Sequence, residues 1–377
     1  MDGKQTAEGI LEMLANGSGF VRTRGSFEPA PADAYVAQSQ IRAFELRTGD
    51  LLRGEVKPPS GKQRWPSLVS IESVEGDPPE NSRGRPLFDS LTAISPETRL
   101  RLESGPTDLT GRAIDLLAPL GLGQRGLIVA PPKAGKTQIL QRIARSVAKN
   151  RPDVILLLLL VDERPEEVTD FRRDGSGQVY ASSFDAAPQS HLHLARMVQA
   201  RAERLVERGR DVFILLDSLT RLARASNLGA KGTGRSLSGG LDAAALTFPR
   251  QFLGDARNIE HGGSLTILAT VLVETGSRLD DIIFEEFKGT GNWEARLDRR
   301  MAERRLYPAL DVAASGTRRE ELLVPDDELQ GINRLRRHLL DYAPEPEART
   351  ERLLNLLQAT QSNAELLSKM ERLSGRR

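Results

Sequence analysis

The sequence of 377 residues contains no cysteine, and this absence excludes several chemistries at once. Disulfides, zinc–thiolate sites, iron–sulfur clusters and thiol catalysis all need the sulfur that this chain lacks. Lysine is also scarce, with nine among 53 basic residues, yet Lys133 and Lys136 lie three positions apart in one short segment. Because the chain otherwise uses arginine, we infer that this segment needs lysine specifically.

The sequence also lacks a long hydrophobic run and a strong net charge. The near-continuous aliphatic run 154–161 covers eight residues, whereas a membrane span needs about 20, so we expect a buried strand there. With 53 basic and 52 acidic residues, the overall charge indicates no polyanion partner, and any nucleic-acid site must be local. Residues 1–12 lack the apolar core of a signal peptide, which favours a cytoplasmic protein.

The length favours two domains, because domains usually run to about 100–200 residues. Short apolar runs separated by turn residues in residues 1–84 are typical of a small β-barrel. Residues 85–116 are rich in Arg, Ser, Pro and Gly and are expected to be a connector. Over residues 117–377, apolar runs alternate with amphipathic helical patterns, which predicts an α/β domain with a mostly parallel sheet.

These patterns also give the individual elements. The expected strands are 19–23, 34–37, 51–57 and 65–74 in the barrel, and 126–130, 154–161, 212–216 and 264–271 in the α/β domain. The expected helices are 136–150, 189–208 and 347–373.

A candidate phosphate-binding loop reads Ala-Pro-Pro-Lys-Ala-Gly-Lys-Thr over residues 130–137 and lies between an expected strand and helix. Backbone N–H groups of such a loop surround an anion, and the helix dipole adds positive potential. Lys136 would then reach the terminal phosphates of a nucleotide, and Thr137 would ligate Mg²⁺. The first position is Ala130 where the motif has glycine, so an ordinary strand–turn–helix junction is the alternative.

Two carboxylates follow expected strands of the same sheet. Asp217 fits the aspartate that holds Mg²⁺ in nucleotide-hydrolysing enzymes, although an aspartate is also a common strand cap. Glu163 stands at the strand end where ligands bind, and it is the candidate base that activates water for attack on the γ-phosphate. The alternative is that residues 162–164 only begin the helix that follows.

Five segments of this sequence resemble the bacterial transcription termination factor Rho family, whose members are hexameric RNA-dependent ATPases and helicases. They are the segments 126–137, 161–169, 216–224, 284–292 and 315–323. The resemblance implies an α/β fold in which a RecA-like parallel-sheet ATPase domain follows a small OB-fold β-barrel that binds RNA. It also implies ATP and Mg²⁺ as cofactors, a homohexameric ring, translocation 5′ to 3′ on single-stranded RNA, and action on the RNA polymerase elongation complex with its associated factors.

The resemblance assigns roles to single residues. Glu163 would activate water, Tyr307 would stack on adenine and Arg305 would act as a second sensor. Arg318 would be the arginine finger that reaches the γ-phosphate bound to the neighbouring subunit, so a monomer is expected to be nearly inactive. Without the family pattern, Arg318 reads as a solvated arginine. The catalytic set implied is Lys133, Lys136, Glu163 and Arg318; the ATP-binding set is Gly121, Leu122, Gly123, Gln124, Arg125, Gly126, Lys133, Ala134, Gly135, Lys136, Thr137, Gln138, Arg164, Asp217, Arg305 and Tyr307.

RNA contacts fall in two regions by the same resemblance. The glycine-rich loop 232–240 would face the central pore, whereas its composition alone equally fits a passive linker. In the barrel, aromatic side chains would stack on bases, whereas Phe20 and Tyr35 also fit a barrel core. The implied pore residues are Arg235, Ser236, Leu237, Ser238, Gly239, Gly240 and Arg278; the implied barrel residues are Gly17, Ser18, Gly19, Phe20, Val21, Arg22, Asp33, Ala34, Tyr35, Arg42 and Trp65.

Several departures from the family pattern modify these expectations. Ser18 stands where a second aromatic is frequent and Gly76 where a base-stacking aromatic is common, so we expect a weaker or differently selective RNA site on the barrel. Arg278 replaces the usual lysine and keeps its charge. The small helical bundle that usually precedes the barrel is not seen, so we expect RNA loading to depend more on partner proteins.

Two other functions share part of these motifs. A rotary ATP synthase or recombinase-type subunit would share the phosphate loop and both carboxylates, but Lys133 and the barrel argue against it. A non-catalytic RNA-binding protein with a decayed ATPase domain is the second alternative. The presence of Glu163, Lys136, Asp217 and Arg318 argues against decay.

Overall fold

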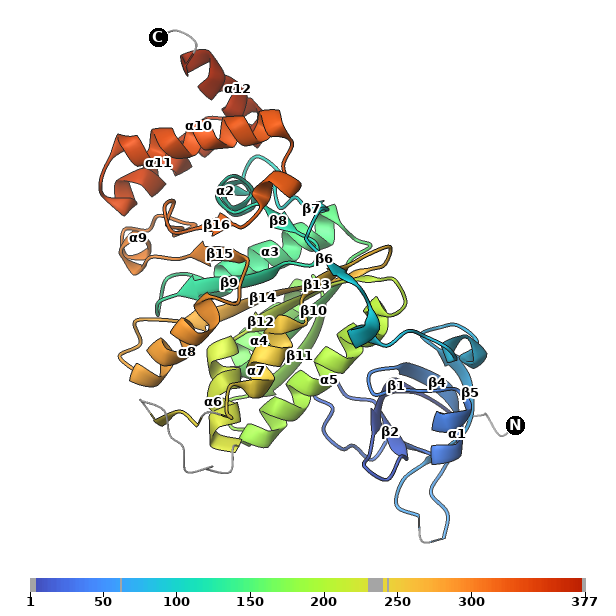
Figure 1. The fold of residues 1–377 in the computed structure, drawn as a ribbon. Coiled ribbons are helices and arrows are strands. Elements are labelled where there is room, and N and C mark those ends of the chain that lie inside the picture. The colour runs from blue at the N-terminus through green and yellow to red at the C-terminus, as the bar shows by residue number, and fades with distance from the viewer. Residues whose placement is uncertain (1–4, 62, 230–239, 243, 375–377) are drawn as a thin grey trace.

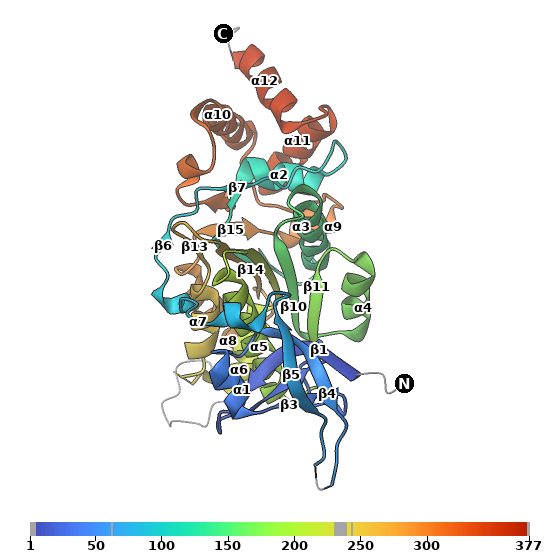
Figure 2. The same cartoon turned by 90° about the vertical axis from the view of Figure 1, so that its right-hand side faces the viewer.

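The computed structural model describes residues 5–61, 63–229, 240–242 and 244–374. A small β-barrel and a cap of C-terminal helices lie at opposite ends of the molecule, with an α/β domain between them (Figure 1). The view at right angles shows the same arrangement (Figure 2). Within the described residues, no helix combines the length and the apolar character that a bilayer crossing requires.

Five strands close the N-terminal barrel in the order β1-β2-β3-β5-β4. They are β1 (Gln5–Met13), β2 (Gly19–Arg22), β3 (Ala34–Val36), β4 (Leu51–Lys57) and β5 (Ser67–Val74), with helix α1 (Gln38–Ala43) between β3 and β4. Side chains that alternate along these strands fill the interior, and Leu11, Val21 and Leu52 are fully buried there. This confirms the expected barrel, but β1 had no counterpart among the expected strands.

The α/β domain is built on one sheet in the order β11-β10-β12-β14-β9-β15-β16. All neighbours along this path are parallel except β16, which is antiparallel to β15. The strands are β9 (Arg125–Ala130), β10 (Ile155–Glu163), β11 (Gln178–Ser183), β12 (Asp211–Asp217), β14 (Ser264–Leu272), β15 (Trp293–Arg296) and β16 (Gly316–Thr317). The aliphatic run in β10 is buried on both faces, as a central parallel strand requires.

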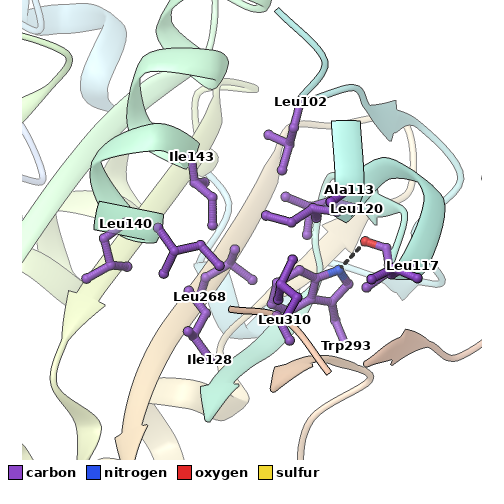
Figure 3. Close-up of a cluster of buried hydrophobic side chains, with 14 of the residues drawn as sticks. Leu102, Ala113, Leu117, Leu120, Ile128, Leu140, Ile143, Leu268, Trp293 and Leu310 are labelled. Atoms are coloured by element: carbon purple, nitrogen blue, oxygen red, sulfur yellow. Dashed lines mark hydrogen bonds between the residues drawn. The ribbon is translucent and has the colours of Figure 1, made fainter. Parts of the chain in front are cut away.

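Helices cover both faces of this sheet. They are α3 (Lys136–Asn150), α4 (Pro165–Asp174), α5 (Pro188–Val206), α6 (Leu219–Gly229), α7 (Thr247–Gly254) and α8 (Arg278–Lys288), and the short helix α9 (Arg299–Glu303) follows β15. On one face, Leu140 and Ile143 of α3 pack with Ile128, Leu268 and Trp293 of the sheet (Figure 3). On the other face, apolar side chains of α5, α6, α7 and α8 form a second core.

Much of the segment expected to be a connector belongs to the α/β domain. Strand β6 (Ala93–Ile94) pairs with β13 (Arg257–Ile259), and β7 (Arg99–Leu100) pairs with β8 (Leu120–Gly121). Helix α2 (Leu109–Leu117) contributes buried residues to the core shown in Figure 3. Composition suggested a linker here because these elements are short and separated by polar turns.

The C-terminal region forms three helices, and two of them occupy the range 347–373 where a single helix was expected. These are α10 (Asp326–Tyr342), α11 (Pro346–Gln358) and α12 (Asn363–Ser374). Arg112 of α2 is fully buried and donates hydrogen bonds to the carbonyl oxygens of Leu357 (2.7 Å) and Thr360 (2.8 Å). It also donates to Thr360 Oγ1 (2.7 Å) and Asn363 Oδ1 (3.3 Å), so one guanidinium holds the turn between α11 and α12.

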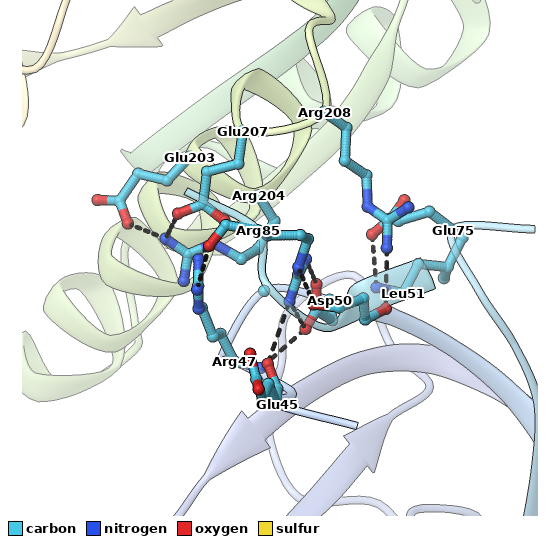
Figure 4. Close-up of polar contacts among 12 residues, drawn as sticks. Glu45, Arg47, Asp50, Leu51, Glu75, Arg85, Glu203, Arg204, Glu207 and Arg208 are labelled. Carbon is cyan, nitrogen blue, oxygen red and sulfur yellow. Dashed lines mark hydrogen bonds and ion pairs between the residues drawn. The ribbon is translucent and has the colours of Figure 1, made fainter. Parts of the chain in front are cut away.

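The barrel is fixed to the α/β domain by ion pairs around the C-terminal end of α5 (Figure 4). Glu207 accepts hydrogen bonds from Arg47 Nη1 of the barrel (2.9 Å), from the backbone N–H of Phe88 (2.9 Å) and from Arg204 Nη2 of α5 (2.8 Å). Arg85 pairs with Asp50 beside this group (2.6 Å). A single buried carboxylate therefore joins the barrel, the following segment and α5.

We expect Arg112→Ala to destabilise the protein by about 3 kcal/mol or more, because it leaves several buried carbonyl oxygens without donors. Urea unfolding followed by helical circular dichroism measures this change in the free energy of unfolding. The exposed Arg337 of α10 gives the matched control, since Arg337→Ala is expected to change it by less than about 0.5 kcal/mol. Equal losses in the two variants would contradict the role given to Arg112.

Candidate active site

The candidate phosphate-binding loop connects the end of β9 to the start of α3. Gly135 is the residue before the helix and has a φ of 92°, and Lys133 has a φ of 65°. A Cβ at Gly135 would lie 3.3 Å from the ring of Tyr307, and the positive φ would add backbone strain. Glycine is therefore required at this position, both by the turn and by the close approach of the aromatic ring.

The structure brings Lys136, Glu163 and Asp217 into direct contact. Lys136 Nζ donates to Glu163 Oε1 at 2.9 Å and to Asp217 Oδ1 at 2.6 Å. Thr270 of β14 donates to the same Asp217 oxygen at 2.7 Å. The sheet order explains this convergence, because β10, β12 and β14 lie side by side and end at the edge where the β9 loop begins.

Glu163 is 2% exposed and reaches the lysine through an irregularity in its strand. The register between β10 and β11 shifts between Val161 and Glu163, and Asp162 has a φ of 58°. Helix α4 begins two residues after Glu163, at Pro165. Asp162 and Glu163 thus end strand β10, and Arg164 directly precedes α4. A place for Glu163 at a strand end is therefore compatible with the start of a helix just after it.

Burial raises the pKa of Glu163 above its ordinary value, and the negative charge of Asp217 raises it further. Lys136 and Arg221 oppose this shift, and Arg221 Nε lies 3.3 Å from Glu163 Oε1. Burial alone would lower the pKa of Lys136, but the charges of Asp217 and Glu163 raise it overall. The site therefore pairs a charged lysine with a carboxylate that accepts a proton more readily than an exposed glutamate does.

These groups line a cavity of about 400 Å³ at the edge of the sheet. Its lining consists of Lys133, Gly135, Lys136, Thr137, Gln138, Glu163, Arg164, Glu167, Arg221 and Tyr307. Sequence reasoning did not single out Glu167, which accepts a hydrogen bond from Thr137 Oγ1 (3.3 Å), or Arg221, which donates to Asp162 (2.8 Å). Arg221 lies inside segment 216–224, one of the five that resemble the Rho family, and this resemblance could have identified it.

A second cavity of about 210 Å³ adjoins the first and shares Gly135, Gln138 and Tyr307 with it. Its other walls include Asp108 and Arg142. The Tyr307 ring therefore stands where the two cavities meet, a position that suits the base of a nucleotide whose phosphates occupy the larger cavity.

Other predicted nucleotide-binding residues lie away from this cavity. The segment 121–126 is at the opposite end of β9, about 17 Å along the strand from the loop. Arg318 lines a separate cavity with Lys288 and Trp293, and its backbone N–H donates to Asn292 (2.9 Å). Arg305 is exposed outside the cavity. Roles for these residues in ATP binding stay predictions, and the role of Arg318 requires a neighbouring subunit.

The barrel carries an aromatic cluster on its outer surface. The Phe20 ring meets Tyr35 edge to face at 5.8 Å and Trp65 at 5.7 Å between centroids. The Arg22 guanidinium lies 5.1 Å from the centre of the Phe20 ring. None of the three rings belongs to the barrel core, and Tyr35 is 38% exposed. This placement favours contact with a ligand over the alternative core role of Phe20 and Tyr35.

Other barrel residues that were predicted to contact RNA have side chains buried inside the barrel. Val21 and Ala34 are fully buried in the barrel core, so their side chains do not face a ligand. Asp33 is also fully buried and accepts hydrogen bonds from Arg22 Nη1 (2.8 Å) and the backbone of Ala30 (2.8 Å).

The remaining barrel predictions divide between the turn and the surface. Ser18 is 3% exposed and donates its hydroxyl to Asn16 (2.8 Å). Gly17 has a φ of 81° in the same turn, and a Cβ at Gly19 would lie 2.6 Å from a carbonyl oxygen of β1. Arg42 of α1 is exposed. The outward-facing members of the predicted set are therefore the three aromatic residues and Arg42.

The predicted pore residues 235–239 lie outside the described residues. Gly240 accepts a hydrogen bond from the Asn227 side chain through its carbonyl oxygen (3.1 Å). Arg278 is exposed at the start of α8. Both residues lie on the side of the sheet that carries α6 and α8.

Comparisons with known proteins agree with this two-part architecture. The RNA-binding domain of Rho termination factor matches residues 7–80, and the nucleotide-binding domain of the ATP synthase alpha/beta family matches residues 111–317. The transcription termination factor Rho of Pseudomonas fluorescens biotype C is 52% identical over 97% of this chain and 88% of its own. That of Bacillus subtilis strain 168 is 50% identical over 95% of this chain and 83% of its own.

A solved structure shares the fold at lower identity. It is an ATPase from the type III secretion system of pathogenic bacteria, with a TM-score of 0.60 and 23% identity over 75% of this chain and 87% of its own. This likeness concerns the fold alone.

We expect Tyr35→Ala to weaken single-stranded RNA binding by about 5- to 150-fold, because one stacked base contributes about 1–3 kcal/mol. Fluorescence anisotropy with a labelled pyrimidine oligonucleotide measures the dissociation constant. Tyr342→Ala removes another exposed tyrosine, from α10 at the opposite end of the molecule, and is expected to leave the affinity unchanged. A similar loss in both variants would argue against the aromatic cluster as an RNA site.

We expect Arg221→Met to move the acid limb of kcat for nucleotide hydrolysis to higher pH. The base must be ionised, so the rate falls as pH drops through the raised pKa of Glu163. Removing a cation 3.3 Å from Glu163 raises that pKa further, and the fall then begins at a higher pH. Arg221→Lys keeps the charge and serves as the control. An unmoved acid limb in Arg221→Met would show that Glu163 is not the titrating base.

Proposed function

Because the chain belongs to the transcription termination factor Rho family, and is thus an RNA-dependent ATPase and helicase, we propose that RNA on its barrel drives ATP hydrolysis in the cavity around Lys136. The observation that carries this proposal is the contact of Lys136 with both Glu163 and Asp217 in one cavity. Family membership sets aside the rotary synthase alternative. A complete catalytic set argues against a decayed ATPase domain.

In this proposal the triphosphate of ATP occupies the larger cavity. Backbone N–H groups of the loop and the start of α3 bind the phosphates, and Lys136 exchanges a carboxylate partner for a phosphate oxygen. Lys133 and Arg164 bring further positive charge to the same cavity. The adenine lies against Tyr307 and Gln138 in the adjoining cavity. The positions of these side chains support this orientation of the nucleotide.

The residues present fit a bound Mg²⁺. Asp217 Oδ2 is buried and has no hydrogen-bond partner among the described residues, so one carboxylate oxygen is available. Thr137 supplies a hydroxyl oxygen on the same edge, and oxygen atoms are the ligands that Mg²⁺ prefers. When bound, Mg²⁺ neutralises charge that develops on the phosphates. Asp217 and Thr137 are the residues that would hold it.

Glu163 acts as the base in this scheme. It takes a proton from a water molecule while the water oxygen bonds to the γ-phosphorus and the bond to the leaving ADP oxygen breaks. Its raised pKa makes it a stronger proton acceptor than an exposed glutamate. Lys136 remains charged and stabilises the negative charge of the transferred phosphoryl group.

A further part of the proposal concerns assembly. Arg318 lies away from the cavity of its own chain, which supports a homohexameric ring in which it completes the site of a neighbour. Single-stranded RNA captured on the barrels then passes 5′ to 3′ through the pore, past Arg278 and the loop that contains Gly240. Its target is the RNA polymerase elongation complex with its associated factors, in the cytoplasm.

We expect ATP turnover to rise strongly on addition of poly(C) and this stimulated rate to fall by about 10²–10⁴-fold in Glu163→Gln, because the base is lost. Steady-state phosphate release with and without RNA measures both effects. Glu166→Gln changes an exposed glutamate in the first turn of α4 and is expected to behave as the wild type. Turnover indifferent to RNA would contradict the proposed coupling, and full activity in Glu163→Gln would contradict the assignment of the base.

A further inference from the structure

Helix α5 packs on one face of the sheet and also contacts the barrel, and two histidines near its start face opposite sides. His191 and His193 are two positions apart, so their side chains leave the helix about 200° apart. His191 faces the α/β domain and is 5% exposed, whereas His193 faces the barrel. Neither residue belongs to the cavity around Lys136.

His191 makes a short side-chain contact with strand β11. Its Nδ1 lies 2.8 Å from Ser182 Oγ, and both residues are buried. Burial lowers the pKa of His191; Asp162 of β10 opposes this shift and Arg221 of α6 adds to it. The lowered pKa favours the neutral ring. Its Nδ1 is directed at the hydroxyl of Ser182, and Asp162 and Arg221 are the charged groups that act on it.

Ser182 lies at the place where β10 departs from regular geometry. It is the register partner of Val161, and the next residue, Ser183, is the partner of Glu163. The register shift between these two pairs, with the left-handed Asp162 inside it, turns Glu163 toward Lys136. The position of β11 at this point therefore determines where the carboxylate of Glu163 stands.

We propose that His191 is a positioning residue for Glu163, which acts through its hydrogen bond to Ser182 and holds β11 at the irregular end of β10. The proposal rests on the role of Glu163 as the base. A shift of about 1 Å in a reacting group lowers rates by up to about 10²-fold, so a single hydrogen bond at this point has a large effect on turnover.

The same turn of α5 and the same strand also contact the barrel. His193 Nε2 lies 3.3 Å from the carbonyl oxygen of Phe27, and its Nδ1 lies 3.6 Å from Glu12 Oε1. Glu12 in turn accepts a hydrogen bond from Arg22, which lies over the Phe20 ring. Helix α5 thus carries both His193, which contacts the barrel beside its aromatic cluster, and His191, which contacts Ser182 near Glu163.

A second contact joins the barrel to β11 itself. The Phe27 ring stacks on Tyr180 with centroids 5.3 Å apart and an angle of 15° between the planes. Tyr180 is two residues before Ser182 in the same strand. Phe27 therefore contacts both the helix that carries His191 and the strand that carries Ser182.

The test uses the full-length protein with saturating ATP and poly(C). His191→Leu and Ser182→Ala are each expected to lower kcat about 10-fold or more, and the double variant to lower it no further, because both remove one interaction. The KM for ATP and the affinity of the barrel for RNA are expected to change less than about twofold. His191→Asn places a polar atom where Nδ1 lies and is expected to recover most of kcat.

A structural role alone predicts other results. His338→Leu on α10 is the matched control and is expected to leave kcat and its pH profile unchanged. In His191→Leu the acid limb of the pH profile of kcat is expected to move, because the surroundings of Glu163 change. A mere loss of folded protein would lower kcat at every pH without moving this limb. An unchanged kcat in His191→Leu, an unmoved acid limb, or a failure of His191→Asn to recover activity overturns the proposal.

The outcomes also separate this proposal from the one on which it rests. If Glu163→Gln retains turnover, the base assignment fails and the positioning role fails with it. If Glu163→Gln abolishes turnover while His191→Leu and Ser182→Ala leave kcat intact, the proposed function stands and only the role of His191 is overturned.

Discussion

A lysine held between two buried carboxylates is the interaction on which the candidate active site of this protein depends. Lys136 joins Glu163 and Asp217, which come from separate strands, and Thr270 of a third strand binds the same aspartate. Removing one partner of a buried ion pair costs about 3–5 kcal/mol, since it leaves a charge without compensation. The ion pairs therefore hold the three groups together, and in the proposed function a phosphate oxygen replaces one carboxylate as the partner of the lysine.

The sequence predicted most elements whose side-chain pattern is set locally. Residues 51–57 and 136–150 became β4 and α3 with the expected bounds, because alternation and helical period were clear there. β1 was missed since Glu8, Gly9 and Glu12 interrupt its apolar alternation, and its pairing with both β2 and β4 is visible only in the closed barrel. The turn that separates α11 from α12 was missed because Arg112, more than 200 residues away, binds it.

The candidate site was predictable where a motif stands at a strand end, and less so where contacts join distant segments. Strand ends predicted Lys136, Glu163 and Asp217, because parallel strands direct their carboxyl ends to one edge. No local pattern distinguishes the inward-facing Asp33 from its outward-facing neighbour Tyr35, since only closure of the barrel assigns each side chain to a face. The contact of α5 with both domains has no sequence signature for the same reason.

The affinity of a non-hydrolysable ATP analogue, measured by calorimetry with and without Mg²⁺, tests most directly whether the nucleotide replaces the carboxylate partners of Lys136. In the wild type Mg²⁺ is expected to strengthen binding. In Asp217→Asn the gain from Mg²⁺ is expected to disappear, while Mg²⁺-free binding becomes tighter because the lysine has lost a competing carboxylate. Asp211→Asn, at the other end of β12, is expected to match the wild type. An undiminished gain from Mg²⁺ in Asp217→Asn, with unchanged or weaker Mg²⁺-free binding, would contradict the account.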